Sequence, residues 1–299
     1  MTDTNHDYGL EMRLHQLEPD LHRRYTDAVV ALRNGLTHYQ TNFPAYTDHS
    51  ILHSMTVIDF CNRLIGGRID RLNEDEIFIL LMSCLLHDTG MGITMQSYEQ
   101  FSSRVDFGSY FETHSREDLP AVIRAFHHEF SGLFIRKYAD LFELPSPEHE
   151  QAIVQVARGH RVTDLMDEKE YPADFRVPDG NTVCLPYLAA MIRLADEIDV
   201  SAARNPLLLY DIDALKNESD VLEFKRHRAI RRLDILDPAF VLEVSTAEEK
   251  VMEQIRILVR KMQRTLTYCR AVVNERTPYT ITQEKVLIHE LDVSCKAAP

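Results

Sequence analysis

A long apolar run that closes on two metal-binding residue types constrains this chain more than any other feature. Residues Ile77–Leu86 are apolar apart from Ser83, and His87 and Asp88 follow at once. Histidine and aspartate both ligate divalent metals well, and burying such groups is costly unless they are paired or coordinate a metal. The run therefore predicts a buried helix that delivers a histidine and an aspartate to an internal site.

Composition indicates a globular chain with room for one large domain or two small ones. Of its 299 residues, 44% are hydrophobic and 27% are charged, which is ordinary for a soluble domain. The net charge of −14 disfavours nonspecific binding to duplex nucleic acid. It does not exclude a phosphorylated substrate, because bound metals and a local basic cluster can reverse the field at one site.

The hydrophobic segments and the cysteines favour a cytoplasmic protein without membrane contact. The longest apolar run is too short to span a bilayer, and the polar, acidic residues 1–8 do not resemble a secretory signal. The five cysteines show no close pairing, so we expect reduced thiols.

Apolar residues recur at three- and four-residue steps and glycine is scarce, so we expect a mainly α-helical fold. Asn73 with Glu76 resembles a capping box that opens the helix ending at His87 and Asp88. Gly90 suits a left-handed position behind that helix. The other expected helices cover Leu21–Tyr39, His53–Leu64 behind an N-cap at Thr47, Leu119–Leu141, Val154–His160 and Leu185–Val200.

The last part of the chain has a mixed character. β-Branched residues and alternation predict short strands at Ala229–Leu236, Phe240–Ser245 and Lys285–Leu291, with a long helix over Ala247–Val273. We therefore expect an α-helical bundle over residues 1–215 and a small α+β subdomain over residues 216–299.

The long helix carries an apolar stripe that we interpret as core. If the stripe is instead an interface, a homodimer is the simplest outcome. The stripe consists of Val251, Ile255, Leu258, Met262, Leu266 and Cys269.

Further metal-binding residue types occur on other predicted helices. A bundle whose helices point such groups inward makes a site for a first-row metal from imidazole and carboxylate. In chain order with His87 and Asp88, the candidates are His53, His127, His128, His160 and Asp196. Adjacent helical residues point about 100° apart, so only one of His127 and His128 is expected to face the metals. We favour His127, because it lies one turn from both Arg124 and Ser131.

These residues resemble the HD superfamily of metal-dependent phosphohydrolases. His53, His87-Asp88 and Asp196 stand in the order of that family, and the resemblance covers roughly residues 46–205. The stretch Arg193–Asp199 is similar to the final aspartate motif of the family. No Gly-Tyr-Pro signature follows the histidines, so cyclic-di-GMP hydrolysis of that type is not implied.

The resemblance implies a two-metal site within an HD-type bundle. His53, His87, Asp88 and Asp196 would hold one divalent metal. His127 and His160 match the two further histidines of family members that hold a second metal, with Asp88 as the bridge. The metal is left open among manganese, iron, magnesium, nickel, cobalt and zinc, since imidazole and carboxylate ligands accept several of them.

The expected activity is hydrolysis of a phosphoester bond in a nucleotide or a related small phosphorylated substrate. Two metals can bind a phosphoryl group and activate a water as hydroxide, so that no protein nucleophile is needed. The alternative is a regulatory module that binds a nucleotide with little or no turnover.

Several residues are candidates for contacts with the substrate. We expect Asp88, Arg124 and His128 to act directly in catalysis, and the basic run Lys225–Arg232 to contact phosphate. Each has a simpler interpretation, because Arg124 can pair with an acid and a charge run is usually a solvated face. His49, Asp199 and Arg204 are left open between a role at the site and an ordinary polar role.

Overall fold

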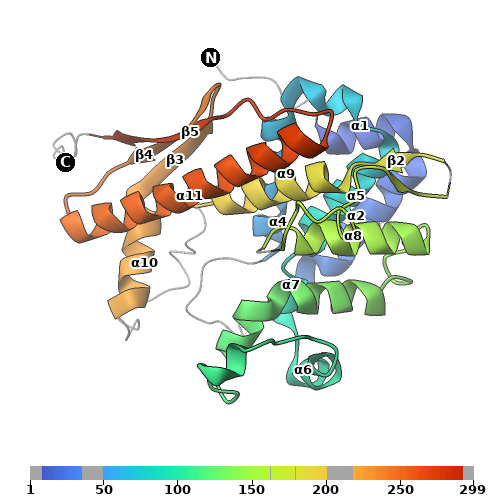
Figure 1. The fold of residues 1–299 in the computed structure, drawn as a ribbon, viewed down its shortest axis with the longest axis horizontal. Coiled ribbons are helices and arrows are strands. Elements are labelled where there is room, and N and C mark those ends of the chain that lie inside the picture. The colour runs from blue at the N-terminus through green and yellow to red at the C-terminus, as the bar shows by residue number, and fades with distance from the viewer. Residues whose placement is uncertain (1–8, 36–49, 162, 179, 201–217, 292–299) are drawn as a thin grey trace.

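The computed structural model describes residues 9–35, 50–161, 163–178, 180–200 and 218–291. The chain is mainly α-helical with a small sheet near its C-terminal end, as the sequence predicts (Figure 1). The first elements are α1 (Leu10–Leu17), α2 (Pro19–Gly35), α4 (Ile51–Ile65), η3 (Gly66–Arg71), α5 (Glu74–Leu86), η4 (Thr89–Gly92), α6 (Met95–Ser102) and η5 (Tyr110–Glu112). They are followed by α7 (Leu119–Lys137), α8 (Pro147–Arg158), β1 (Phe175–Arg176), β2 (Thr182–Val183), α9 (Leu185–Ile198), α10 (Glu218–Ala229), β3 (Ile230–Ile235), β4 (Ala239–Val244), α11 (Glu249–Arg276) and β5 (Lys285–Glu290).

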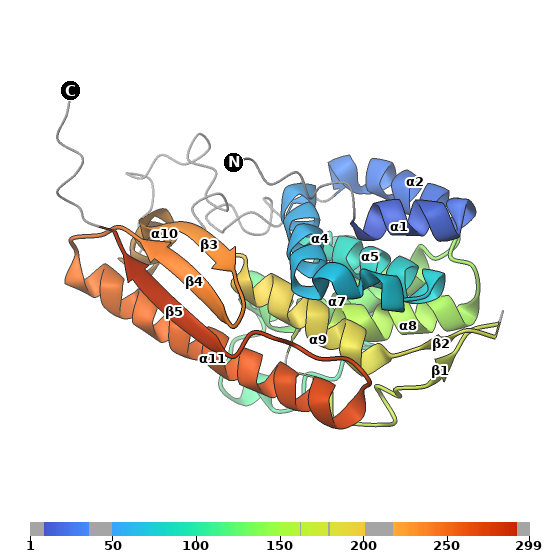
Figure 2. The same ribbon diagram turned by 90° about the horizontal axis from the view of Figure 1, so that it is seen from above.

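Helix α5 is the centre of the bundle. Every side chain from Asp75 to Leu86 is buried, and α1, α2, α4, α8 and α9 pack around it (Figure 2). A helix that is apolar on all sides belongs in a core, because it has no polar face to turn toward water. Its predicted capping box is confirmed: Asn73 Oδ1 accepts from the Glu76 amide at 2.9 Å, and Glu76 Oε2 accepts from the Asn73 amide at 3.2 Å. His87 and Asp88 thus lie directly after the C-terminal end of a buried helix.

Some predicted helix ends differ from the observed ones. Helix α7 ends at Lys137 rather than Leu141, because the chain turns away through residues 138–143. Helix α4 is capped by Ser50, whose side chain accepts from the Leu52 amide. The predicted cap at Thr47 lies outside the described residues.

Gly90 does not adopt the left-handed conformation that the sequence predicts. Positive φ occurs instead at Gly66, where α4 ends with φ of 54°. Gly90 is needed for close packing: a Cβ there would lie 2.1 Å from the carbonyl oxygen of His127 and 2.7 Å from the amide nitrogen of Ser131. Ser131 Oγ accepts from the Gly90 amide at 2.8 Å and donates to the His87 carbonyl at 2.5 Å. Hydrogen bonds of Ser131 therefore join the turn after α5 directly to α7.

The C-terminal elements are a three-stranded sheet and the long helix α11. Strands β3 and β4 pair antiparallel, β4 and β5 pair parallel, and α11 connects β4 to β5 (Figure 1). All six stripe residues of α11 are buried, in one core that also holds α9, so the interpretation as core is confirmed. The expected division near residue 215 falls among residues that the structure does not describe, and it stays a prediction.

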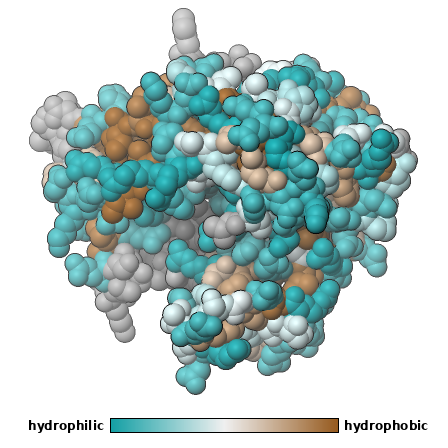
Figure 3. Space-filling model, viewed as in Figure 1, coloured by the Kyte–Doolittle hydropathy of each residue, from teal (hydrophilic) through white to brown (hydrophobic). Residues whose placement is uncertain are grey.

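The described residues include four free cysteines and no single helix suited to cross a membrane. The face in Figure 3 is mostly hydrophilic, with scattered apolar patches. No single described helix has the length and apolar character to cross a membrane, although α5–η4 and α6, bent by 103°, pass as a pair on length and composition. Cys61, Cys84, Cys184 and Cys269 are buried free thiols, and Cys295 lies outside the described residues.

Substituting Gly90 tests this packing. We expect Gly90→Ala to lower the free energy of unfolding by about 1–3 kcal/mol or more, since overpacking against backbone atoms cannot be relieved by a rotamer change. Gly67→Ala is the matched control, because a Cβ at that position meets no atom within 4 Å. It should change stability by less than about 0.5 kcal/mol. Urea denaturation measures the free energy of unfolding of both variants. Equal values for Gly90→Ala and Gly67→Ala would contradict the packing role of Gly90.

Candidate metal centre

Four histidines and two aspartates meet where five helices converge. They come from α4, the end of α5, α7, the turn after α8, and α9. All are buried except Asp196, which is partly exposed. Two groups can each hold a metal ion, with potential ligand atoms within 4.8 Å of one another. The first is His53, His87 and Asp88, and the second is Asp88, His127 and His160.

Asp88 belongs to both groups because its two carboxylate oxygens face opposite sides. Oδ2 lies 3.5 Å from Nε2 of His53 and 3.5 Å from Nε2 of His87. Oδ1 lies 3.4 Å from Nε2 of His127 and 3.7 Å from Nε2 of His160. Asp196 Oδ1 lies on the first side, 3.3 Å from His53 Nε2 and 3.9 Å from His87 Nε2. The geometry of a bridging carboxylate is therefore present in the side chains themselves.

Backbone carbonyls orient three of the four imidazoles in the same way. In each case Nδ1 lies within hydrogen-bonding distance of the carbonyl oxygen three residues earlier, so Nδ1 is the ring nitrogen that carries hydrogen. The pairs are His87 with Cys84 at 2.8 Å, His127 with Arg124 at 2.7 Å, and His160 with Ala157 at 2.5 Å. The carbonyl acceptors fix the tautomer and turn Nε2 inward.

A carboxylate orients the fourth imidazole. Nδ1 of His53 lies 2.7 Å from Oδ2 of Asp199, and both side chains are buried. Hydrogen bonds of this kind from the outer nitrogen of a ligating histidine hold the ring in place and raise its basicity. Asp199, one of the residues that the sequence left open, thus positions His53.

The inward nitrogens of the four imidazoles lie close together in two pairs. Nε2 of His53 lies 3.2 Å from Nε2 of His87, and Nε2 of His127 lies 2.9 Å from Nε2 of His160. With hydrogen on Nδ1, each pair brings two lone pairs face to face, which is repulsive without a cation between them. Imidazole nitrogen and carboxylate oxygen are the donors that first-row divalent metals take. The donor set fits a metal.

The ionisation states also suit metal binding. Burial lowers the pKa of His127 to about 3, and the opposing charge of Asp88 does not restore it. Burial, together with His87 and His127, lowers the pKa of His160 well below its ordinary value. Burial alone would raise the pKa of Asp196, but its close contact with the imidazole of His53, together with His160 and His87, lowers it below the usual range. Neutral imidazoles and an ionised carboxylate are the ligand forms.

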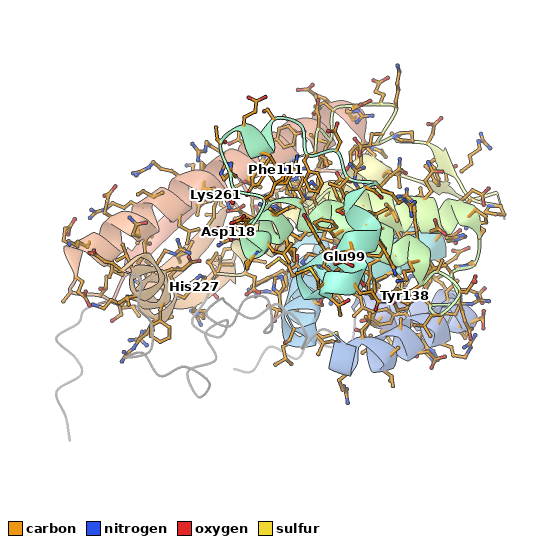
Figure 4. All side chains as sticks on the ribbon, turned by 90° about the horizontal axis from the view of Figure 1, so that it is seen from below. Glu99, Phe111, Asp118, Tyr138, His227 and Lys261 are labelled. Carbon is orange, nitrogen blue, oxygen red and sulfur yellow. The ribbon has the colours of Figure 1, made fainter. Side chains whose placement is uncertain are left out.

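A cavity of about 350 Å³ opens on this cluster. Asp88, His127, His160 and Asp196 line one side. The C-terminal helices α10 and α11 line the other with Glu223, Arg226, His227, Ile257, Leu258 and Lys261. Figure 3 shows a recess on the face between α11 and the part below it that contains α6 and α7. In Figure 4, His227 and Lys261 lie on the sides of α10 and α11 that face α7.

The predicted substrate contacts divide into two groups. Arg124 lines the cavity, and so does Arg226 from the basic run Lys225–Arg232. His227 of that run also lines it, whereas Lys225, Arg228, Arg231 and Arg232 do not. Lys225 pairs with Glu248 at 2.7 Å and Arg232 pairs with Asp234 at 2.9 Å, so most of the run is a solvated face.

His128 does not line the cavity. Its Nε2 lies 3.5 Å from Oε1 of Glu129, its Nδ1 is buried without a hydrogen-bond partner, and burial lowers its pKa to about 4. Of the two neighbours it is His127 that faces Asp88, as we favoured, and the predicted phosphate contact of His128 has no counterpart in the geometry. His49 and Arg204 lie outside the described residues.

Sequence reasoning missed residues that act through contacts between distant segments. Arg193 Nε donates to the Gly159 carbonyl at 2.6 Å, which ties the turn carrying His160 to α9. Arg161 and Lys261 line the cavity although they are 100 positions apart. The only signal in the sequence was the position of Arg161 directly after His160.

Comparison with known proteins agrees with this geometry. The family model HD-CE matches residues 43–278, a range that includes all six residues of the cluster and most of the chain. No curated protein matches the sequence significantly.

Removing the carboxylate behind His53 tests its positioning role. We expect Asp199→Ala to weaken Mn²⁺ binding about 10–100-fold, the usual effect of losing such an outer hydrogen bond. The exposed Asp140→Ala should bind Mn²⁺ like the wild type. Isothermal titration of metal-stripped protein measures both. Unchanged affinity in Asp199→Ala, or an equal loss in Asp140→Ala, would refute the role.

Proposed function

Since the chain belongs to the HD-CE family, we propose that it is a metal-dependent phosphohydrolase. Its substrate is a nucleotide or a related small phosphorylated molecule, and the bond that it cleaves is a phosphoester. The family match and the buried His/Asp cluster support a metal-dependent hydrolase, and the proposal extends this to phosphoester chemistry.

The observation that carries the proposal is the position of Asp88 between two pairs of histidines. His53, His87 and Asp196 would hold one metal, His127 and His160 a second, and Asp88 would bridge them. When bound, such metals polarise a phosphoryl oxygen and lower the pKa of a water molecule. The histidines are already oriented by their outer hydrogen bonds, and Asp196 is ionised, as this donor set requires.

The remaining side chains of the cavity suit a phosphorylated ligand. No hydroxyl or thiol side chain is among the described residues that line it, which favours water over a protein nucleophile. Arg124, on α7, lines the cavity. Its planar guanidinium matches the geometry of phosphate oxygens. Asp199 and the carbonyl acceptors orient the imidazoles, and burial keeps His127 and His160 neutral.

Activity is tested by incubating the purified chain with Mn²⁺ and a panel of nucleotides and simple phosphoesters. We expect phosphoester hydrolysis that EDTA abolishes. Asp88→Ala should lower kcat/KM at least about a hundredfold, because metal catalysis contributes several kcal/mol to such reactions. Asp140→Ala serves as the control and should keep wild-type kinetics.

Two outcomes would contradict the proposal. Full activity in Asp88→Ala would separate hydrolysis from the cluster. Tight nucleotide binding without product, in protein shown to contain metal, would instead favour a regulatory nucleotide-binding module.

A further inference from the structure

Arg161 lies beside the cluster and forms no ion pair with any residue that the structure describes. It is half-buried, lines the cavity and follows His160 directly. Its side chain makes no hydrogen bond or ion pair with any residue that the structure describes, and its Nε is buried without a partner. Its charge contributes to the lowered pKa of His127, after the larger effect of burial. A guanidinium in this position has hydrogen-bond donors available.

Arg226 faces the same cavity from α10 with part of its donor capacity unused. Its Nη2 lies 3.3 Å from Oε1 of Glu223 and 3.2 Å from Nε2 of His227, while its Nε is buried without a partner. Burial lowers its pKa, and the positive charge of Arg124 lowers it further against the opposing effect of Glu223. The site thus holds cations that repel one another, an arrangement that an anionic ligand would relieve.

The charges around the cavity, apart from the metal ligands, favour an anion. Apart from the cluster and Asp199, the lining carries four cations, Arg124, Arg161, Arg226 and Lys261, against two acids, Glu197 and Glu223. Lys261 is already paired with Glu197 at 3.0 Å. The two arginines therefore remain as the groups with spare donors, and their planar forks match phosphate oxygens.

We propose that Arg161 and Arg226 form a second phosphate-binding subsite, so that the substrate carries at least two phosphate groups, as a nucleoside di- or triphosphate does. This inference rests on the proposed function for the first phosphate, which the His/Asp cluster would bind. The apolar side chains Ile257 and Leu258 line the same cavity and offer a surface for the remainder of the substrate.

Binding of inorganic phosphates to the full chain tests the subsite without any turnover. Metal is removed with EDTA, and orthophosphate and tripolyphosphate are titrated calorimetrically at constant ionic strength. We expect tripolyphosphate to bind at least tenfold more tightly than orthophosphate. Arg161→Gln and Arg226→Gln should each weaken tripolyphosphate binding at least tenfold.

Arg228→Gln is the matched control, because Arg228 lies on the same helix, is exposed and does not line the cavity. It should leave tripolyphosphate affinity within twofold of the wild type. If Arg226→Gln does not fold, Arg226→Lys keeps the charge and loses the fork, and it should still weaken binding severalfold. Equal affinity for both phosphates, wild-type affinity in the cavity variants, or an equal loss in Arg228→Gln would overturn the subsite.

The outcome for the subsite is separable from that for hydrolysis. Arginine-dependent tripolyphosphate binding in a protein that hydrolyses nothing would support the subsite and reject the phosphohydrolase. Hydrolysis of simple monoesters without such binding would do the reverse.

Discussion

The constraint at the centre of this protein is the convergence of four imidazole nitrogens on the carboxylate of Asp88. Each outer ring nitrogen is committed to a carbonyl or carboxylate oxygen, so the inner nitrogens meet at 2.9 and 3.2 Å with no hydrogen between them. Such a contact is unfavourable in a buried site unless a cation offsets it. The fold thus brings together groups that make physical sense only as ligands, and the carboxylate of Asp88 is the one that faces both pairs.

The rest of the fold holds these groups in place. The buried helix α5 delivers His87 and Asp88, and Gly90 with Ser131 fastens the following turn against α7. Arg193 fastens the turn that carries His160, and Asp199 holds His53. The C-terminal helices α10 and α11 then close the far side of the cavity with basic and apolar side chains.

Local patterns in the sequence predicted most helices of the bundle, the capping box and the residues that meet in the cluster, because periodicity and residue type report directly on burial and chemistry. They also favoured His127 over His128, from the angle between adjacent helical residues. They were wrong about Gly90, since a tight contact between η4 and α7 leaves no local trace. The contact of Asp199 with His53 and the shared cavity of Arg161 and Arg226 join segments 146 and 65 positions apart in the chain, which only the folded structure brings together.

Metal content measures the central claim most directly. The chain, produced with divalent metals in the medium and freed of unbound ions, is analysed by inductively coupled plasma mass spectrometry with Asp88→Ala and a His127→Ala/His160→Ala double variant. The account predicts two metal ions per wild-type chain, one in the double variant, and little or none in Asp88→Ala. Wild-type protein without metal, or Asp88→Ala with the full complement, would contradict it.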